Sequence, residues 1–203
     1  MERRFPAFVR AVIDGDVAAA ASLLKTHPVL VAQTFADTMF FRDIVHYAYQ
    51  GDTALHMAAA AFQHSTARLL VRKGAALDAQ NRRGAEPLHY AADTNWWHPK
   101  AQAATITFLL SAGANVHAQD ANGATPLHRA VRTRSAVAVR ALLAGGADVH
   151  AKNKNGSTPA DLAGRTTGRG GSGSPRAKAQ QAEIIAMLTD AGGSPARTRG
   201  SSL

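Results

Sequence analysis

The sequence predicts an all-α solenoid of about five stacked helix pairs, three of them full and two acting as caps. The first observation behind this prediction is that four segments align: GDTALHMAA, GAEPLHYAA, GATPLHRAV and GSTPADLAG, which begin at Gly51, Gly84, Gly123 and Gly156. The second is that a further block follows each of them: ARLLVRKGAALDAQ, ITFLLSAGANVHAQ, VRALLAGGADVHAK and the truncated IIAMLTDAGG. Two blocks that recur in a fixed order indicate one structural unit used repeatedly.

Each unit contains the residues that begin and end a pair of helices. Thr125 and Pro126 favour a helix start, because threonine caps free amides and proline fits the first helical turn. Alanines keep this first helix thin, and the paired leucines Leu142 and Leu143 supply the buried stripe of the second. Gly146 then permits the left-handed conformation that ends a helix. We therefore expect a short helix, a second helix and an extended segment in each unit.

These motifs resemble the ankyrin repeat, whose pattern is G-x-T-P-L-H-x-A-A followed by x-L-L-x-x-G-A-D-V-N-A. Residues 123–155 match it most fully, and the segments GDTALH, GAEPLHYAAD, TPLHRAVRTR and TTGRGGSGSP resemble a family of bacterial ankyrin-repeat proteins over residues 5–193. The resemblance implies a solenoid with a binding role. It also implies that His56, His89 and His128 are structural and form hydrogen bonds between neighbouring turns.

The repeats divide the chain into an ankyrin-repeat domain, residues 5–193, and a tail, residues 194–203. We expect the tail to be disordered, because it has no core residues. The expected units are an N-terminal cap with an enlarged connection (5–50), full repeats at 51–83, 84–122 and 123–155, and a C-terminal capping repeat (156–193). Residues 34–50 hold five of the ten Phe and Tyr residues. We expect them to form an enlarged finger or a short extra helix, with most of the rings packed on the cap. Direct contact of these rings with a partner is the alternative.

The composition excludes several kinds of site. Without cysteine, the chain has no disulfide, thiolate metal site or thiol nucleophile. No Ser-His-Asp order, His-Glu-x-x-His motif or carboxylate pair indicates catalysis, so we expect no enzyme, cofactor or metal. No stretch has the length of a membrane span, and the N-terminus lacks the apolar run of a signal peptide. We expect a cytoplasmic monomer.

Two insertions interrupt the repeats, each between the two helices of a unit. The first lies in DTNWWHPKAQA, residues 93–103, and the second in GRTTGRGGSGSPRAK, residues 164–178. The second contains G-x-G-x-x-G, but a dinucleotide site also needs a preceding strand and a parallel sheet, which the repeats do not provide. Two interpretations stay open: a flexible linker, or a loop that holds an anion through its four cations, Arg165, Arg169, Arg176 and Lys178.

The expected function is that of a non-catalytic protein interaction scaffold with an acidic partner. The net charge is +9, and residues 151–203 carry eight Lys and Arg against three Asp and Glu, which favours acidic partners. The resemblance implies contacts on the concave face, through Arg82, Arg83, Tyr90, Asp93, Arg129, Arg132, Lys154 and Arg165. A second candidate is the edge bearing the insertions, with Trp96, Trp97 and Arg169 beside Arg132. The alternative function is binding of an anionic ligand or nucleic acid by the C-terminal basic loop.

Shortening residues 168–174 to a few Gly and Ser residues is expected to leave the fold nearly intact. Loop closure changes the free energy of unfolding by only about 0.6 kcal/mol per doubling of loop length. Urea denaturation of the shortened chain measures the effect. A large loss of stability would mean that this segment is packed rather than free.

Overall fold

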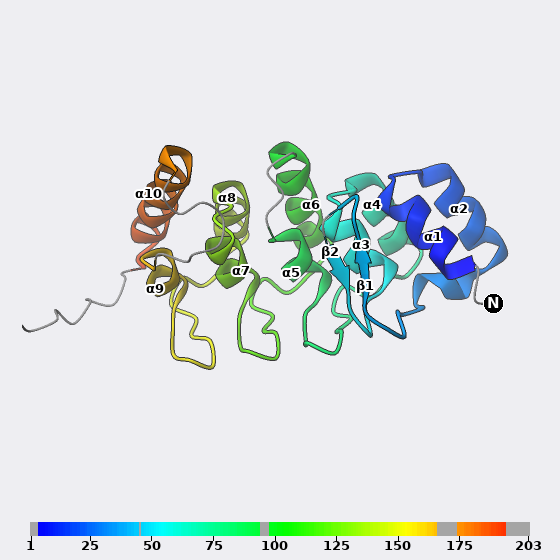
Figure 1. Ribbon diagram of the computed structural model, residues 1–203, viewed down its shortest axis with the longest axis horizontal. Coiled ribbons are helices and arrows are strands. Elements are labelled where there is room, and N and C mark those ends of the chain that lie inside the picture. The colour runs from blue at the N-terminus through cyan, green and yellow to red at the C-terminus, as the bar shows by residue number, and fades with distance from the viewer. Residues whose placement is uncertain (1–3, 45, 94–97, 166–173, 194–203) are drawn as a thin grey trace, which may run out of the picture.

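The structure is a computed structural model that describes residues 4–44, 46–93, 98–165 and 174–193. Its elements are, in chain order, α1 (Arg4–Ile13), α2 (Val17–Thr26), the 3-10 helix η1 (Pro28–Val31), β1 (Met39–Phe41), β2 (His46–Ala48), α3 (Ala54–Ala60), α4 (His64–Arg72), α5 (Pro87–Ala91), α6 (Pro99–Ser111), α7 (Pro126–Arg132), α8 (Ala136–Ala144), α9 (Pro159–Ala163) and α10 (Pro175–Asp190). The helices stack in pairs along the long axis of the molecule (Figure 1). The predicted solenoid is confirmed.

The helix pairs form two layers. The shorter helices α3, α5, α7 and α9 pack in sequence against one another, and α4, α6, α8 and α10 form a second row behind them. Extended loops between successive pairs project from one side of the stack, as Figure 1 shows. The shorter helices and the loops together form the inner face.

Local sequence explains where the helices begin and end. Thr125 caps α7 through its hydroxyl, Pro126 is the first helical residue, and His128 completes a reciprocal cap from the third position. At the other end of the pair, Gly146 has a φ of +85°, the left-handed conformation predicted there. The repeat motif thus encodes its own helix boundaries.

The repeated histidines join each unit to the next. The Nε2 atom of His56 lies 3.0 Å from the carbonyl oxygen of Ala85. His89 and His128 reach Ala124 and Ser157 in the same way, each also over 3.0 Å. On the other side of the ring, Nδ1 of His56 accepts the Thr53 amide. The expected structural role of these rings is confirmed.

The core runs through the stack between the two layers. Leu70, Leu109 and Leu142 are fully buried, and they come from α4, α6 and α8. Leu143 is only partly buried and packs at the margin of this core. The prediction that both leucines of the pair are buried therefore holds at Leu142 and is wrong at Leu143, because a helix turns neighbouring side chains about 100° apart.

The enlarged connection forms a β-hairpin. Strands β1 and β2 are antiparallel, with Met39 opposite Ala48 and Phe40 opposite Tyr47. Phe35 is buried, and its ring meets that of Phe5 edge-on at 5.1 Å between centroids. Phe40 and Tyr47 instead point to solvent, 44% and 49% exposed. The rings are thus divided between the N-terminal cap and the surface, where most had been expected on the cap.

Both insertions lie between the helices of a pair. Helix α5 ends at Ala91 before α6 begins at Pro99, and α9 ends at Ala163 before α10 begins at Pro175. Trp96, Trp97, Arg169 and the tail at residues 194–203 lie outside the described residues, so the predictions made for them stay predictions.

Candidate functional site

The structure separates the predicted contact residues by exposure. Five are exposed and lie on loops or near the ends of α7 and α9: Arg82, Arg83, Arg132, Lys154 and Arg165. Tyr90 and Arg129 are buried, only 1% and 6% exposed, and Asp93 is partly buried. The repeat spacing had placed Tyr90 and Arg129 on the surface. That placement is wrong, because the hairpin and the neighbouring repeats cover them.

Five of the predicted residues meet at one pocket of about 160 Å³ on the inner face. Its lining consists of the predicted Arg83, Tyr90, Asp93, Arg129 and Arg132, together with His46, Tyr47, Tyr49 and Asn81. The hairpin therefore supplies one wall, α5 the floor and α7 the opposite wall. Arg82, Lys154 and Arg165 lie outside this lining.

One part of the floor is a buried hydrogen-bond network around Asp52. The Tyr90 hydroxyl donates to Asp52 Oδ2 at 2.6 Å, and the Asn81 side-chain amide donates to Asp52 Oδ1 at 2.8 Å. The same amide donates to the Tyr90 oxygen at 2.9 Å. Burial raises the pKa of Tyr90. The Tyr90 hydroxyl already donates its hydrogen to Asp52. The side chain therefore forms part of the pocket floor and does not donate a proton to a ligand.

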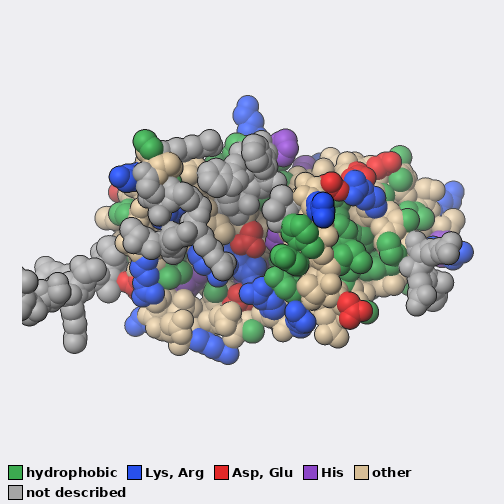
Figure 2. All heavy atoms as spheres, in the orientation of Figure 1, with side chains coloured by type: hydrophobic (Ala, Val, Ile, Leu, Met, Phe, Trp, Pro, Cys, Tyr) green, Lys and Arg blue, Asp and Glu red, His purple; other side chains and the backbone are tan. Residues whose placement is uncertain are grey.

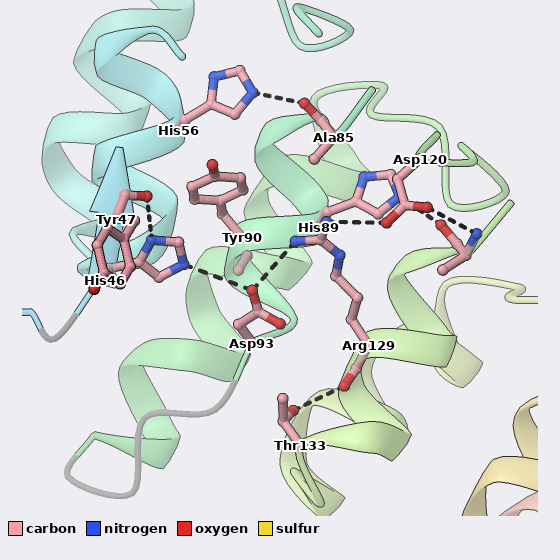
Figure 3. A network of polar contacts seen from close by, with 12 residues as sticks. His46, Tyr47, His56, Ala85, His89, Tyr90, Asp93, Asp120, Arg129 and Thr133 are labelled. Carbon is pink, nitrogen blue, oxygen red and sulfur yellow. Dashed lines mark hydrogen bonds and ion pairs between the residues drawn. The ribbon is translucent and has the colours of Figure 1, made fainter. Parts of the chain in front are cut away.

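A second network neutralises Arg129. Its guanidinium lies 3.3 Å from Asp93 Oδ2 and 3.1 Å from Asp120 Oδ2 (Figure 3). Burial would lower the pKa of Arg129, but the two carboxylates outweigh burial and raise it. Asp120 is held in turn by the backbone amides of Asn122 and Ala124. Arg129 therefore joins the units 84–122 and 123–155, and its charge is already paired within the protein.

His46 fixes the hairpin to this network. Its ring lies 4.6 Å from the Tyr90 ring between centroids, and Nε2 lies 3.6 Å from Asp93 Oδ2. Its Nδ1 is 2.8 Å from the Tyr47 carbonyl oxygen, so Nδ1 carries a hydrogen and donates it. Burial would raise the pKa of Asp93, but the His46 and Arg129 contacts outweigh it and lower it. Figure 3 shows His46 and Arg129 on opposite sides of Asp93.

The rim of the pocket carries cations and exposed rings. The Arg83 and Arg82 guanidinium carbons lie 4.8 and 5.5 Å from the Tyr49 ring centroid. Within the described part of the chain, neither these arginines nor Arg132 forms an ion pair with a carboxylate. Next to them, the exposed rings of Phe40 and Tyr47 lie 4.7 Å apart. Figure 2 shows apolar side chains beside a group of Lys and Arg side chains on this face.

The predicted contact residues did not include His46, Tyr47, Tyr49 and Asn81, which also line the pocket. His46 interacts with Asp93, 47 positions later in the sequence. Asn81 follows the recurrent block ending at Gln80, but its contacts reach back to Asp52. No local pattern marks such pairs, because their partners come from different units.

The described residues hold neither a cluster of metal ligands nor a membrane-spanning helix. No three histidine or acidic side chains there come together as metal ligands would. Nor does any helix there combine the length and the hydropathy that a bilayer span requires.

Comparison with known protein families gives two matches. A sequence model of three ankyrin repeats matches residues 8–120, and a model of many such repeats matches residues 109–163. No curated protein matches the sequence.

Proposed function

This chain belongs to the ankyrin-repeat family, and on that premise we propose that it is a scaffold that binds an acidic protein segment on its inner face. Ankyrin repeats are general protein interaction modules, and proteins built from them are typically non-catalytic.

The observation that carries the proposal is the unpaired charge at the pocket rim. Arg83, on the loop before α5, and Arg132, at the end of α7, both line this pocket, whereas Arg129 is already neutralised by Asp93 and Asp120. A carboxylate approaching the rim thus meets guanidinium groups that form no ion pair among the described residues, and Arg132 also interacts electrostatically with Asp93. Charge-assisted hydrogen bonds of this kind are stronger than neutral ones.

The exposed hairpin rings add an apolar contact. Phe40 and Tyr47 are about half exposed and adjoin the pocket that Tyr47 lines. Exposed aromatic side chains next to arginine are typical of interface hot spots. We infer a partner segment that places an apolar side chain against these rings and an acidic side chain between Arg83 and Arg132.

The size of the pocket favours a protein side chain over a small-molecule ligand. Small-molecule sites usually enclose roughly 300–1,000 Å³, and this pocket holds about 160 Å³. The Tyr90 hydroxyl on its floor is also hydrogen-bonded within the protein, to Asp52. These features support recognition without catalysis.

Reversing the rim charge is expected to weaken binding of an acidic peptide at least tenfold, about 1.4 kcal/mol. The probe is a fluorescently labelled synthetic peptide rich in Glu with one Trp, and the measurement is fluorescence anisotropy. The test variant is Arg83→Glu with Arg132→Glu. The matched control is Arg68→Glu with Arg72→Glu, two exposed arginines on α4. Both variants change the net charge equally, so the control is expected to bind almost like the parent.

Other outcomes point to other sites. Equal weakening in both variants would mean that only net charge matters, and the inner-face proposal would be wrong. Loss on Trp96→Ala with Trp97→Ala, but not on rim reversal, would favour the insertion edge. Salt-sensitive binding of duplex DNA that depends on Arg169 and Lys178 would favour the basic C-terminal loop.

A further inference from the structure

The turn between α7 and α8 holds a buried cation without a partner. Arg134 is only 8% exposed, and its terminal nitrogens, Nη1 and Nη2, are buried and make no hydrogen bond among the described residues. Burying a charged group without pairing it costs free energy. A guanidinium in this state calls for an explanation.

An equivalent turn shows that packing alone does not require this arginine. Phe62 follows α3 as Arg134 follows α7, and both have a left-handed backbone, with φ of +53° and +59°. Phe62 fills its position with a buried ring, 3% exposed. Non-glycine residues in this conformation carry a strain of about 1–3 kcal/mol. Arg134 therefore combines backbone strain with an unpaired charge. At the equivalent position after α3, the apolar ring of Phe62 is buried instead.

The side chain of Arg134 lies at a small pocket between the last two helix pairs. Arg132 and Arg165 also line this pocket, together with Gln181 and apolar residues of α7, α9 and α10. Its volume is about 10 Å³, close to what one water-sized atom occupies. Three arginines thus line a space that accepts a single atom, and one of them, Arg165, also donates to Ser157 Oγ at 3.1 Å.

Two acidic side chains of α9 and α10, Asp161 and Glu183, interact with groups outside this pocket. Asp161 accepts hydrogen bonds from the Thr158 amide and hydroxyl, and Glu183 pairs with Arg140. The lining of the pocket contains no Asp or Glu among the described residues. The positive charge of the three arginines is not balanced at the pocket itself.

We propose that this pocket is a binding site for a small oxyanion, with one oxygen seated against Nη1 and Nη2 of Arg134. Both terminal nitrogens carry N–H groups that can donate to this oxygen, and charge-assisted hydrogen bonds from arginine to a carboxylate or phosphate are stronger than neutral ones. Arg132 and Arg165 hold the remainder of the anion at the exposed mouth, because both are exposed. Free phosphate and a carboxylate group share this chemistry. The site shares Arg132 with the rim of the inner-face pocket, but it is separate from the floor of that pocket and does not require the partner proposed above.

The experiment titrates the full chain with inorganic phosphate and, separately, with sodium acetate, by isothermal calorimetry at constant ionic strength. We expect saturable binding of at least one of them. Arg134→Phe, which copies Phe62, is expected to weaken it at least tenfold. Arg68→Ala on α4 is the control and is expected to bind like the parent. Tighter phosphate binding identifies a phosphate group as the natural ligand, and tighter acetate binding identifies a carboxylate.

Two further variants guard against a folding defect. Arg134→Gly removes the guanidinium and relieves the left-handed strain, and Arg132→Gln with Arg165→Gln alters only exposed side chains. Each is expected to weaken binding at least tenfold with an unchanged far-UV circular dichroism spectrum. The proposal is overturned if neither anion binds saturably to the parent, or if folded Arg134 variants bind as tightly as the parent.

Discussion

Leu142→Ala is expected to lower the free energy of unfolding by about 2–5 kcal/mol. Leu142 is fully buried on α8, which packs against α6 on one side and α10 on the other. Cutting the side chain to a methyl group leaves a cavity that the close-packed neighbours fill only in part. The loss also passes to the interfaces with both neighbouring units, because each repeat is stabilised by its neighbours. Urea denaturation followed by circular dichroism measures it.

Leu143→Ala is the matched control for that experiment. The same atoms are removed from the same helix, but Leu143 is only partly buried, so less apolar surface is returned to water. We expect a clearly smaller loss of stability than at Leu142. An unchanged urea midpoint in Leu142→Ala, or an equal loss in the two variants, would contradict the proposed register of α8.

Acidification is expected to destabilise the fold between about pH 6.5 and pH 4. Burial lowers the pKa of His89 to about 4, and it also lowers the pKa values of His56 and His128. In this window the unfolded chain binds protons that the folded chain does not, so stability falls as the pH falls. His89 alone contributes on the order of 3 kcal/mol across the window.

The hydrogen bonds explain why these rings stay neutral. Nδ1 of His89 accepts the Glu86 amide, and Nε2 faces the Ala124 carbonyl, to which it donates. A proton added at Nδ1 would turn this atom into a donor that faces a second donor, the Glu86 amide, in a buried position. Asp93 and Asp120 add acid sensitivity at lower pH. Their pKa values are lowered, so their contribution is lost only below the ordinary aspartate value of about 3.9.

The measurement is the free energy of unfolding in urea at a series of pH values. His89→Gln lacks the titrating ring, and its stability is expected to depend less steeply on pH over this window, although its stability near neutral pH is lower. His150→Asn replaces an exposed ring and is expected to keep the steepness of the parent. If His89→Gln keeps the full dependence, burial of this ring is not the cause.

Much of the fold was accessible from the sequence because the determining contacts repeat. Thr125, Pro126 and Gly146 define helix ends within a few residues of themselves, and the same pattern recurs from unit to unit. The bridge from His128 to Ser157 is not local, but it follows from stacking identical units. Where the repeat pattern stops, prediction weakened: residues 34–50 form a hairpin that the sequence left undecided between an enlarged finger and a helix.

The candidate site was only partly accessible for the same reason. The sequence identified Arg83, Tyr90, Asp93, Arg129 and Arg132, which do meet at one pocket, but it assigned them all to the surface. It had no means of showing that Asp93 and Asp120 neutralise Arg129, because these contacts join different units. Nor did it show that His46 closes the network from the hairpin.

The sequence by itself determined the repeat and its helix boundaries, since these depend on short spacings that recur, and its resemblance to the ankyrin repeat implied the histidine bridges between units. Only the tertiary structure decided which charges remain free. Arg129 is neutralised, Arg83 and Arg132 are unpaired at the rim, and Arg134 is buried without a partner in the described part of the chain. The physical reason is that the free energy of a charge depends on its burial and on the groups around it, and those groups are brought together by packing between units.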